Sequence, residues 1–263
     1  PSCELNGFEL LISPLADDAL DLRNHQSVVT HYYAQCEKLV SELTGGNAYA
    51  FDHNVRAATG KNSRQRVTGG QDVQGPAHVV HGDYTLRSGP ERLTQLASPP
   101  SGNDTLRSFL DEGATLIPDE VVQKVVKTGQ RFAIINVWRN ISGDPVVTHP
   151  MALCDAQTVN AEELVVFEIH YADRIGENYF SKYSDKHTMY YYLEMTRDEA
   201  LIIKQWDSAG TLAKSNGKMS DSAQPNSPCT FSFHSAFVDP TTTLDAPDQW
   251  SIEVRCMVIY TEE

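Results

Sequence analysis

Strand-like segments fill the second half of this chain, and they constrain its fold more than any other feature. From Arg131 onward, six runs are rich in β-branched and aromatic residues, and Gly, Pro, Asp or Asn bound each of them. The runs are RFAIINVWR, ELVVFEIHY, TMYYYLEM, LIIKQWDS, CTFSFHSAFV and WSIEVRCMVIYT. Such a series predicts a β-rich domain, because strands of this kind form sheets whose apolar faces a second layer of structure must cover.

Helical patterns come before these strands. One runs from about Leu20 to Leu43 and is stopped by Gly45 and Gly46; after it, AYAF predicts a short strand. Three shorter helices are predicted at PERLTQLA, NDTLRSFLDEG and PDEVVQKVVKTG. Helices first and many strands later predict a mainly β fold with flanking helices, a double-stranded β-helix of the jelly-roll, cupin-like kind. We expect one domain over 1–263, with an N-terminal helical part at about 15–46 and a β core at about 76–262.

Composition excludes several functions. The formal charge of −14, with no Lys/Arg cluster, argues against a nucleic-acid partner. No apolar run approaches the roughly 18 residues that span a bilayer, so we expect no membrane segment. Five scattered cysteines without a C-x-x-C pair favour a cytoplasmic protein. No secretory signal is visible, although the first residue is Pro and the N-terminus is open to trimming.

Two residues in PAHVVHGDYT carry the strongest chemical signal. His81 and Asp83 are two apart, so in a strand they point to the same side and can share a metal ion. His234, in TFSFHSAFVDP, is a third candidate ligand, far enough along the chain to return on a neighbouring strand of a jelly roll. Two imidazoles and one carboxylate are the ligand set of non-haem Fe(II) oxygenases. Surface or hydrogen-bonded histidines are the alternative interpretation. The Gly- and Gln-rich stretch 56–75 before this motif predicts a loop.

Other strand residues are candidates to shape a pocket. In WSIEVRCMVIY, Ser251, Glu253, Arg255 and Met257 share one face, and a guanidinium inside a strand needs an anionic partner. That partner is either an internal acid such as Glu253 or a bound carboxylate. Trp138 and Arg139 have opposite parity, so only one of them points inward, whereas Lys204 and Trp206 are expected to share a face. The substrate-binding candidates are Arg139, Trp138, Tyr190, Tyr192 and His149.

Several ordered motifs resemble a known family. NVWRNI, HPMALCD, HTMYYYLEMTRDEALIIKQWDS, FHSAFVDP and SIEVR, between about Phe51 and Tyr260, are similar to the fungal hydroxylase/desaturase enzymes related to gibberellin desaturase and the cephem 7α-methoxylase component. The resemblance implies an Fe(II)/2-oxoglutarate-dependent dioxygenase that uses O2. It implies that His81, Asp83 and His234 bind Fe(II), and that Arg255, with Ser251 beside it, binds 2-oxoglutarate. The family tends to place Pro-Arg before the last strand, where this chain has Pro247-Asp248.

These features together predict an oxidoreductase of fungal secondary metabolism that hydroxylates, desaturates or cyclises a small molecule. Neither the substrate nor the oligomeric state is indicated, and a homodimer is one option. A cupin-like metalloenzyme that does not use 2-oxoglutarate, an isomerase or hydrolase, is the alternative. A metal-free binding module is a third, which the complete His-x-Asp…His set disfavours.

Overall fold

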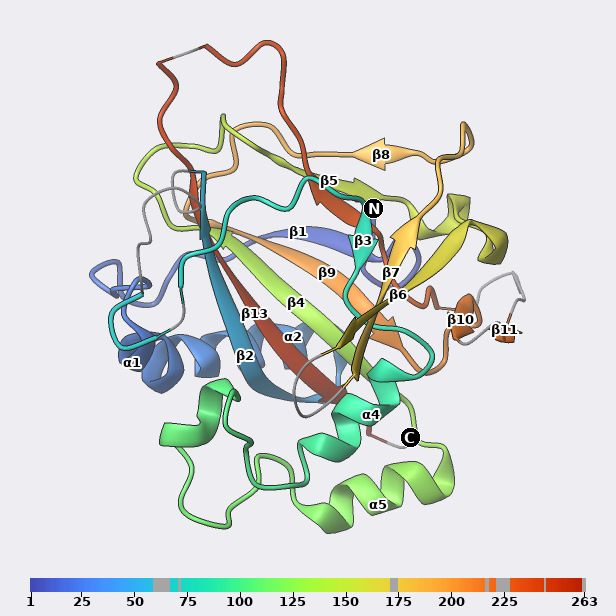
Figure 1. The fold of residues 1–263 in the computed structure, drawn as a ribbon. Coiled ribbons are helices and arrows are strands. Elements are labelled where there is room, and N and C mark those ends of the chain that lie inside the picture. The colour runs from blue at the N-terminus through green and yellow to red at the C-terminus, as the bar shows by residue number, and fades with distance from the viewer. Residues whose placement is uncertain are drawn as a thin grey trace.

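Two sheets of antiparallel strands face each other in the computed structural model, which describes residues 1–58, 67–70, 72–170, 175–215, 218–220, 228–243 and 245–261 (Figure 1). The larger sheet has the order β1 (Phe8–Ile12), β9 (Glu199–Asp207), β4 (Phe132–Asn140), β13 (Trp250–Ile259) and β2 (Asn47–Ala57). The smaller has the order β6 (Leu164–His170), β7 (Ile175–Ser181), β3 (His81–Gly82), β12 (His234–Ala236), β5 (Met151–Cys154) and β8 (Met189–Tyr190). A separate hairpin joins β10 (Ala213–Ser215) to β11 (Lys218–Ser220). The predicted jelly-roll class is confirmed.

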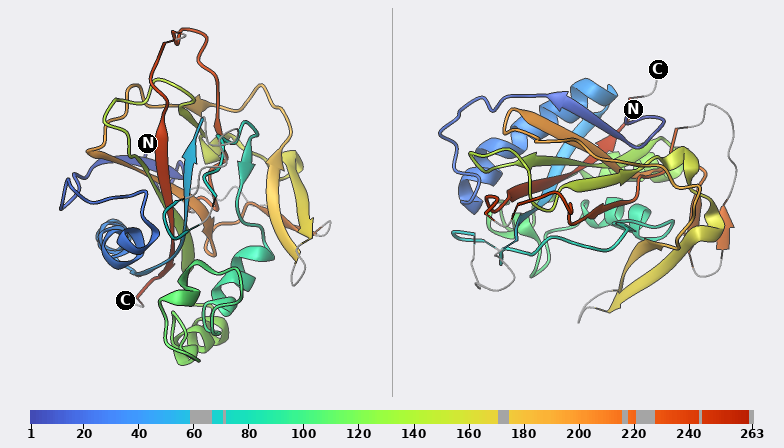
Figure 2. Two further views of the ribbon diagram at one scale, coloured as in Figure 1. Left: turned by 60° about the vertical axis from the view of Figure 1, so that its left-hand side comes forward. Right: turned by 90° about the horizontal axis from the view of Figure 1, so that it is seen from above.

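The N-terminal helical segment covers the outer face of the larger sheet (Figure 2). It consists of α1 (His25–Ser27), a π-helical turn (Val28–Tyr32) and α2 (Tyr33–Thr44). The Asn24 side chain accepts a hydrogen bond from the Ser27 N–H at the start. Gly45 ends α2 with a φ of 71°, a conformation that glycine adopts without a Cβ clash. The helix predicted between Leu20 and Leu43 is therefore present, although it begins at His25.

Strand alternation decides what the space between the sheets contains. On β13, Ile252, Val254, Cys256 and Val258 belong to the cluster under the helix, so Ser251, Glu253, Arg255 and Met257 face inward as predicted. On β4, Asn136 and Trp138 face inward, and Arg139 faces the helix. A second apolar cluster, with Phe231, Phe233 and Trp206, fills one end of the space between the sheets. Polar inward-facing residues are thus concentrated near the middle of the larger sheet.

A β-bulge in β9 makes one prediction wrong. Pairing with β4 matches Lys204 to Ile135 and Trp206 to Ile134, so the register passes over Gln205. Consecutive residues of β4 point to opposite faces, and therefore Lys204 and Trp206 do not share a face. The extra residue, Gln205, is free to turn its side chain inward, where it accepts a hydrogen bond from the Asp83 N–H.

Other elements differ from the predictions in length. Two predicted helices form α4 (Ser88–Gln95) and α5 (Asp119–Thr128), but NDTLRSFLDEG yields only a 3-10 turn at Thr105–Ser108. TMYYYLEM and CTFSFHSAFV contribute only the short β8 and β12. In the second run, Ser232 N–H bonds to the Lys204 carbonyl, which links it to the larger sheet before β12 begins. The predicted loop over 56–75 includes residues 59–66 and 71, which lie outside the described residues.

No helix in the described part of the chain has the length and apolar character needed to cross a bilayer.

Candidate metal centre

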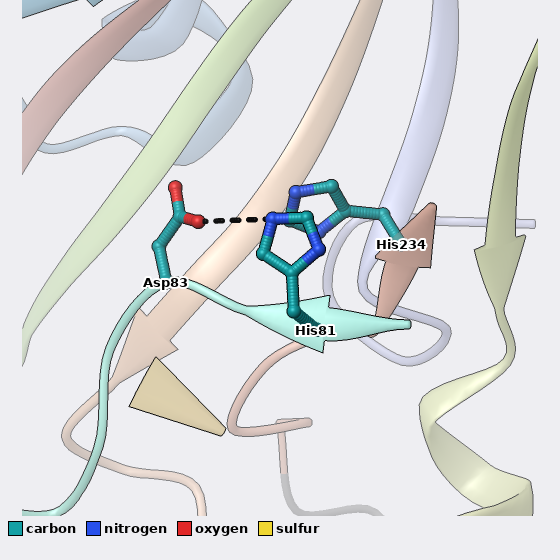
Figure 3. Close-up of side chains that lie close together, drawn as sticks. All are labelled: His81, Asp83 and His234. Atoms are coloured by element: carbon teal, nitrogen blue, oxygen red, sulfur yellow. Dashed lines mark ion pairs between the residues drawn. The ribbon is translucent and has the colours of Figure 1, made fainter. Parts of the chain in front are cut away.

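Three potential metal ligands meet between the two sheets (Figure 3). His234 on β12 pairs directly with His81 on β3, so the predicted return to a neighbouring strand is confirmed. Their ring centroids are 4.4 Å apart. Asp83 follows β3, and its carboxylate turns toward the rings, with Oδ1 at 3.6 Å from His81 Nε2. One ligand atom from each residue lies within 4.8 Å of the other two.

Both imidazoles are arranged to offer a lone pair. His81 Nδ1 donates to the Val79 carbonyl at 2.8 Å, and Nε2 lies on the side of Asp83, 3.6 Å from its Oδ1. His234 is buried, and burial together with the neighbouring His81 lowers its pKa to about 3, against the opposing effect of Asp83. No hydrogen-bond partner for His234 Nδ1 is found in the described part of the chain. A buried, neutral imidazole with an unpartnered nitrogen is suited to metal binding.

The carboxylate of Asp83 is kept ionised by its neighbours. Burial opposes its charge, but Arg255 and the two histidines hold the pKa well below its usual range. Arg255 Nε and Nη2 each lie 3.4 Å from Oδ2, and Asn136 Nδ2 donates to the same oxygen at 3.3 Å. Gln205 Oε1 accepts from the backbone N–H at 3.1 Å. Oδ2 is thus held by the larger sheet, and Oδ1 faces the histidines.

This donor set fits an Fe(II) ion. Two imidazoles and one carboxylate occupy one side of an octahedral site and leave positions for a co-substrate. The unpartnered Nδ1 of His234 supports the fit, because a buried polar atom without a partner is costly unless a ligand binds it.

A cavity opens on the three residues, and the space in it and at its mouth, open solvent included, is about 530 Å³. Besides the three candidate ligands, its wall combines apolar side chains such as Ala57, Ala77 and Met151 with five polar ones: Arg56, His149, Gln249, Ser251 and Glu253. Polar groups in such a mixed wall can orient a small organic molecule.

The structure separates the predicted substrate-binding residues into two groups. Trp138 and His149 line the cavity, as does Ser251, which was assigned to the co-substrate. His149 has a φ of 46°, an uncommon conformation for a residue other than glycine. Arg139 lies on the other face of the sheet, where its Nε donates to the Tyr32 hydroxyl and its Nη1 to the Arg197 carbonyl.

Neither predicted tyrosine lines the cavity. Tyr190 is 40% exposed and contacts Phe8 at a ring distance of 5.6 Å. Tyr192 lines a separate surface hollow together with Leu193 and Asp239.

Arg255 is surrounded by acids. Besides Asp83, it contacts Asp52 Oδ2 through Nη1 at 2.9 Å and Glu253 Oε1 through Nη2 at 3.1 Å. Burial opposes its charge, but these three carboxylates keep its pKa well above the usual range. The structure therefore shows an internal acid, Glu253, as a partner of Arg255. The binding of 2-oxoglutarate by Arg255 stays a prediction.

Sequence reasoning missed several residues around Asp83. Asn136 and Gln205 both contact it, and Arg56 reaches the same cavity from β2. The available signal was a polar residue inside an otherwise apolar strand, as in AIINVW and LIIKQWD. Such residues need buried partners and therefore mark a polar site.

Several known proteins are similar to this chain, and the matches cover different shares of its length. Residues 1–259 match the family model described as oxidoreductase/YMDC permease-like domain. A protein of Methylophilus leisingeri, described as an uncharacterized protein in the dcmA 3′ region, is 45% identical over 139 residues, 52% of this chain and 64% of its own length. The hydroxylase/desaturase poxK of Penicillium oxalicum is 30% identical over 207 residues, 71% of this chain and 54% of that protein.

One relative is similar in both sequence and structure. The Fe(II)/2-oxoglutarate-dependent dioxygenase nvfI of Aspergillus novofumigatus is 28% identical over 251 residues, 94% of this chain and 73% of that protein. A solved structure of an iron and alpha-ketoglutarate-dependent endoperoxidase, NvfI, covers all of this chain with a TM-score of 0.75 at 22% identity, and 82% of that chain is covered. The match supports the jelly-roll fold. The chain spans less than two thirds of the length of the first two relatives above.

Proposed function

This chain belongs to the oxidoreductase/YMDC permease-like domain family, and we propose that it is an Fe(II)- and 2-oxoglutarate-dependent dioxygenase acting on a small molecule. The observation that carries the proposal is the meeting of His81, Asp83 and His234 at the wall of one cavity. Fungal relatives named hydroxylase/desaturase and Fe(II)/2-oxoglutarate-dependent dioxygenase support it. A metalloenzyme that does not use 2-oxoglutarate has no comparable support among these relatives.

The chemistry is divided between cofactor and protein. A bound Fe(II), with 2-oxoglutarate and O2, would supply the oxidising power to attack a C–H bond, and the protein supplies placement and exclusion of water. His81 and His234 would hold the ion through imidazole nitrogens, and Asp83 through a carboxylate that remains ionised. Trp138, which is 2% exposed, closes part of the wall and keeps water from the site.

The product class follows from substrate placement. Hydroxylation, desaturation and oxidative cyclisation differ in which C–H bond lies nearest the metal, so cavity residues such as His149 and Trp138 would select among them. We propose a substrate from secondary metabolism, in line with the fungal relatives. The five cysteines, all free and four of them buried, support the cytoplasm as its location.

An anaerobic visible spectrum tests the proposal. Fe(II) and then 2-oxoglutarate are added to the apo-protein, and a His234→Ala variant is treated in parallel. We expect a weak metal-to-ligand charge-transfer band in the native protein and none in the variant. Metal binding without the band would contradict the use of 2-oxoglutarate, and absence of metal binding would contradict the enzyme assignment.

A further inference from the structure

We propose that Arg56, together with Ser251, binds the distal carboxylate of the keto-acid co-substrate, and that Arg255 is a positioning residue for Asp83. The inference rests on the proposed function, because it concerns the same cavity and a 2-oxo dicarboxylate in it. It assigns a role to a residue of β2 that the sequence motifs do not single out.

Arg255 already has more negative charge around it than it can neutralise. Its guanidinium contacts Asp52 at 2.9 Å, Glu253 at 3.1 Å and Asp83 at 3.4 Å. A fourth carboxylate at this position would meet three others, and like charges at such distances repel strongly in a buried site. The same contacts orient Oδ2 of Asp83, so the guanidinium already serves the metal ligand.

Arg56 has the opposite electrostatic situation. Its Nη1 donates to the Gly75 carbonyl at 2.9 Å, and no carboxylate of the described residues lies within ion-pair distance of it. Glu253 is near enough to interact with this charge, but its direct contact is with Arg255, so the Arg56 guanidinium keeps donors for an incoming anion. Its planar fork suits a carboxylate bound through two parallel hydrogen bonds.

Strand register places Arg56 beside a hydroxyl on the correct face. β2 pairs with β13 so that Arg56 lies opposite Ser251, and opposed residues of antiparallel strands project to the same face. Ser251 faces inward, hence Arg56 does too, and both line the cavity that contains His81, Asp83 and His234. Ser251 is buried, and its hydroxyl belongs to the same cavity wall as Arg56.

Arg255 faces a different space. It lines a second hollow, which Asp83 also borders, and it is not among the residues that line the metal cavity. Glu253, the acid nearest to the Arg56–Ser251 pair along β13, is bound by Arg255 Nη2. Among the described residues that line the cavity, Arg56 is therefore a cation with no carboxylate in direct contact, and the keto acid would span the distance from the metal to it.

The test compares two keto acids of equal length. With Fe(II)-loaded protein under anaerobic conditions, dissociation constants are measured for 2-oxoglutarate and for 2-oxopentanoate, which lacks the distal carboxylate. We expect the native protein to prefer 2-oxoglutarate by about 10- to 150-fold, the value of hydrogen bonds to a charged group. Arg56→Met should abolish this preference, Arg56→Lys should retain part of it, and Ser251→Ala should reduce it several-fold.

Arg255→Met is the matched control, because it makes the same substitution on the adjacent strand. Arg255→Met should weaken the binding of Fe(II) and of both keto acids to a similar degree. The preference for 2-oxoglutarate over 2-oxopentanoate should therefore stay intact. The inference is overturned if Arg56→Met keeps the native preference, or if Arg255→Met alone removes it. If Arg56→Met does not fold, Arg56→Lys takes its place, and an unchanged preference in that variant overturns the inference. A native protein that binds Fe(II) but neither keto acid would instead overturn the proposed function.

Discussion

At the scale of single residues, the three candidate ligands differ in how firmly they are held. Asp83 has contacts to Arg255, Asn136 and Gln205, whereas His81 is fixed by one hydrogen bond and His234 by burial. The carboxylate is therefore the preorganised member, and the imidazoles complete the site around it. Outer partners of this kind contribute to metal affinity as well as to geometry.

Removing either imidazole should nearly abolish metal binding. Loss of a residue that only contacts a metal ligand costs about 10- to 100-fold in metal affinity. We expect His81→Ala and His234→Ala each to weaken Fe(II) binding by more than this. Calorimetric titration under anaerobic conditions measures this. His78→Ala is the control, since that ring is exposed and meets His149 edge-on at 4.9 Å, outside the triad. Equal losses in all three variants would contradict the assignment.

A buried histidine outside the triad should make stability depend on pH. Burial lowers the pKa of His53 from 6.5 to about 4, against the effect of Asp52, while the Tyr33 hydroxyl bonds its Nδ1 at 2.9 Å. As pH falls below 6.5 the unfolded chain takes up a proton that the folded one does not. The free energy of unfolding therefore falls as the pH is lowered from 6.5 to about 4. The loss is at most about 3 kcal/mol.

Urea unfolding at several pH values measures this loss. His53→Gln should flatten the dependence between pH 6.5 and about 4, whereas His170→Gln, at an exposed site, should follow the native curve. An unchanged slope in His53→Gln would show that other groups cause the loss.

At the scale of elements, long alternating or apolar runs could be predicted and short or irregular ones could not. β4, β9 and β13 coincide closely with runs named from the sequence, because each is buried on both faces. β7 was missed, since IGENYFS mixes polar and apolar residues without a clear period. The two-residue β3 is defined by its partners, Phe180 on one side and His234 on the other.

The candidate site could likewise be predicted only where the signal lies within one strand. Parity within one strand correctly grouped Ser251 with Glu253 on one face and separated Trp138 from Arg139, because alternation is a local property. Partners from other strands were not accessible in this way. That Asp52 and Asp83 both contact Arg255 depends on how β2 and β3 lie across from β13. The bulge at Gln205 likewise arises only from pairing with β4.

One helix contact should tolerate no added methyl group. Gly89 of α4 is buried, and a Cβ there would lie 2.8 Å from Cγ of the Trp206 ring. Gly89→Ala should therefore lower the unfolding free energy by about 1–3 kcal/mol, even though alanine is the better helix former. Denaturant unfolding provides the measurement. Gly143→Ala, where a Cβ meets nothing within 4 Å, should change it little. A stabilised Gly89→Ala would mean that α4 shifts easily.

At the scale of the whole molecule, metal binding should stabilise the fold because the ligands come from two strands and the segment after β3. At a free metal concentration of 100 times Kd, one site adds about 2.7 kcal/mol. For a chain of this size we expect Tm to rise by about 5–10 °C. Scanning calorimetry with Mn(II) or anaerobic Fe(II) measures the rise, and His234→Ala should show none. An equal rise in that variant would place the stabilising metal elsewhere.

The strand order has a consequence for when the protein acquires its metal. His234 follows His81 by about 150 residues, and β13, which carries Arg255, is inserted between β4 and β2 although it comes after both in the sequence. At about 5–20 residues per second, a ribosome needs on the order of ten seconds to add the segment between the two histidines. Until then a nascent chain offers only His81 and Asp83, without the arginine that orients the carboxylate. The complete ligand set therefore exists only once His234 has been added and β12 has paired with β3, so we expect metal binding to follow these steps.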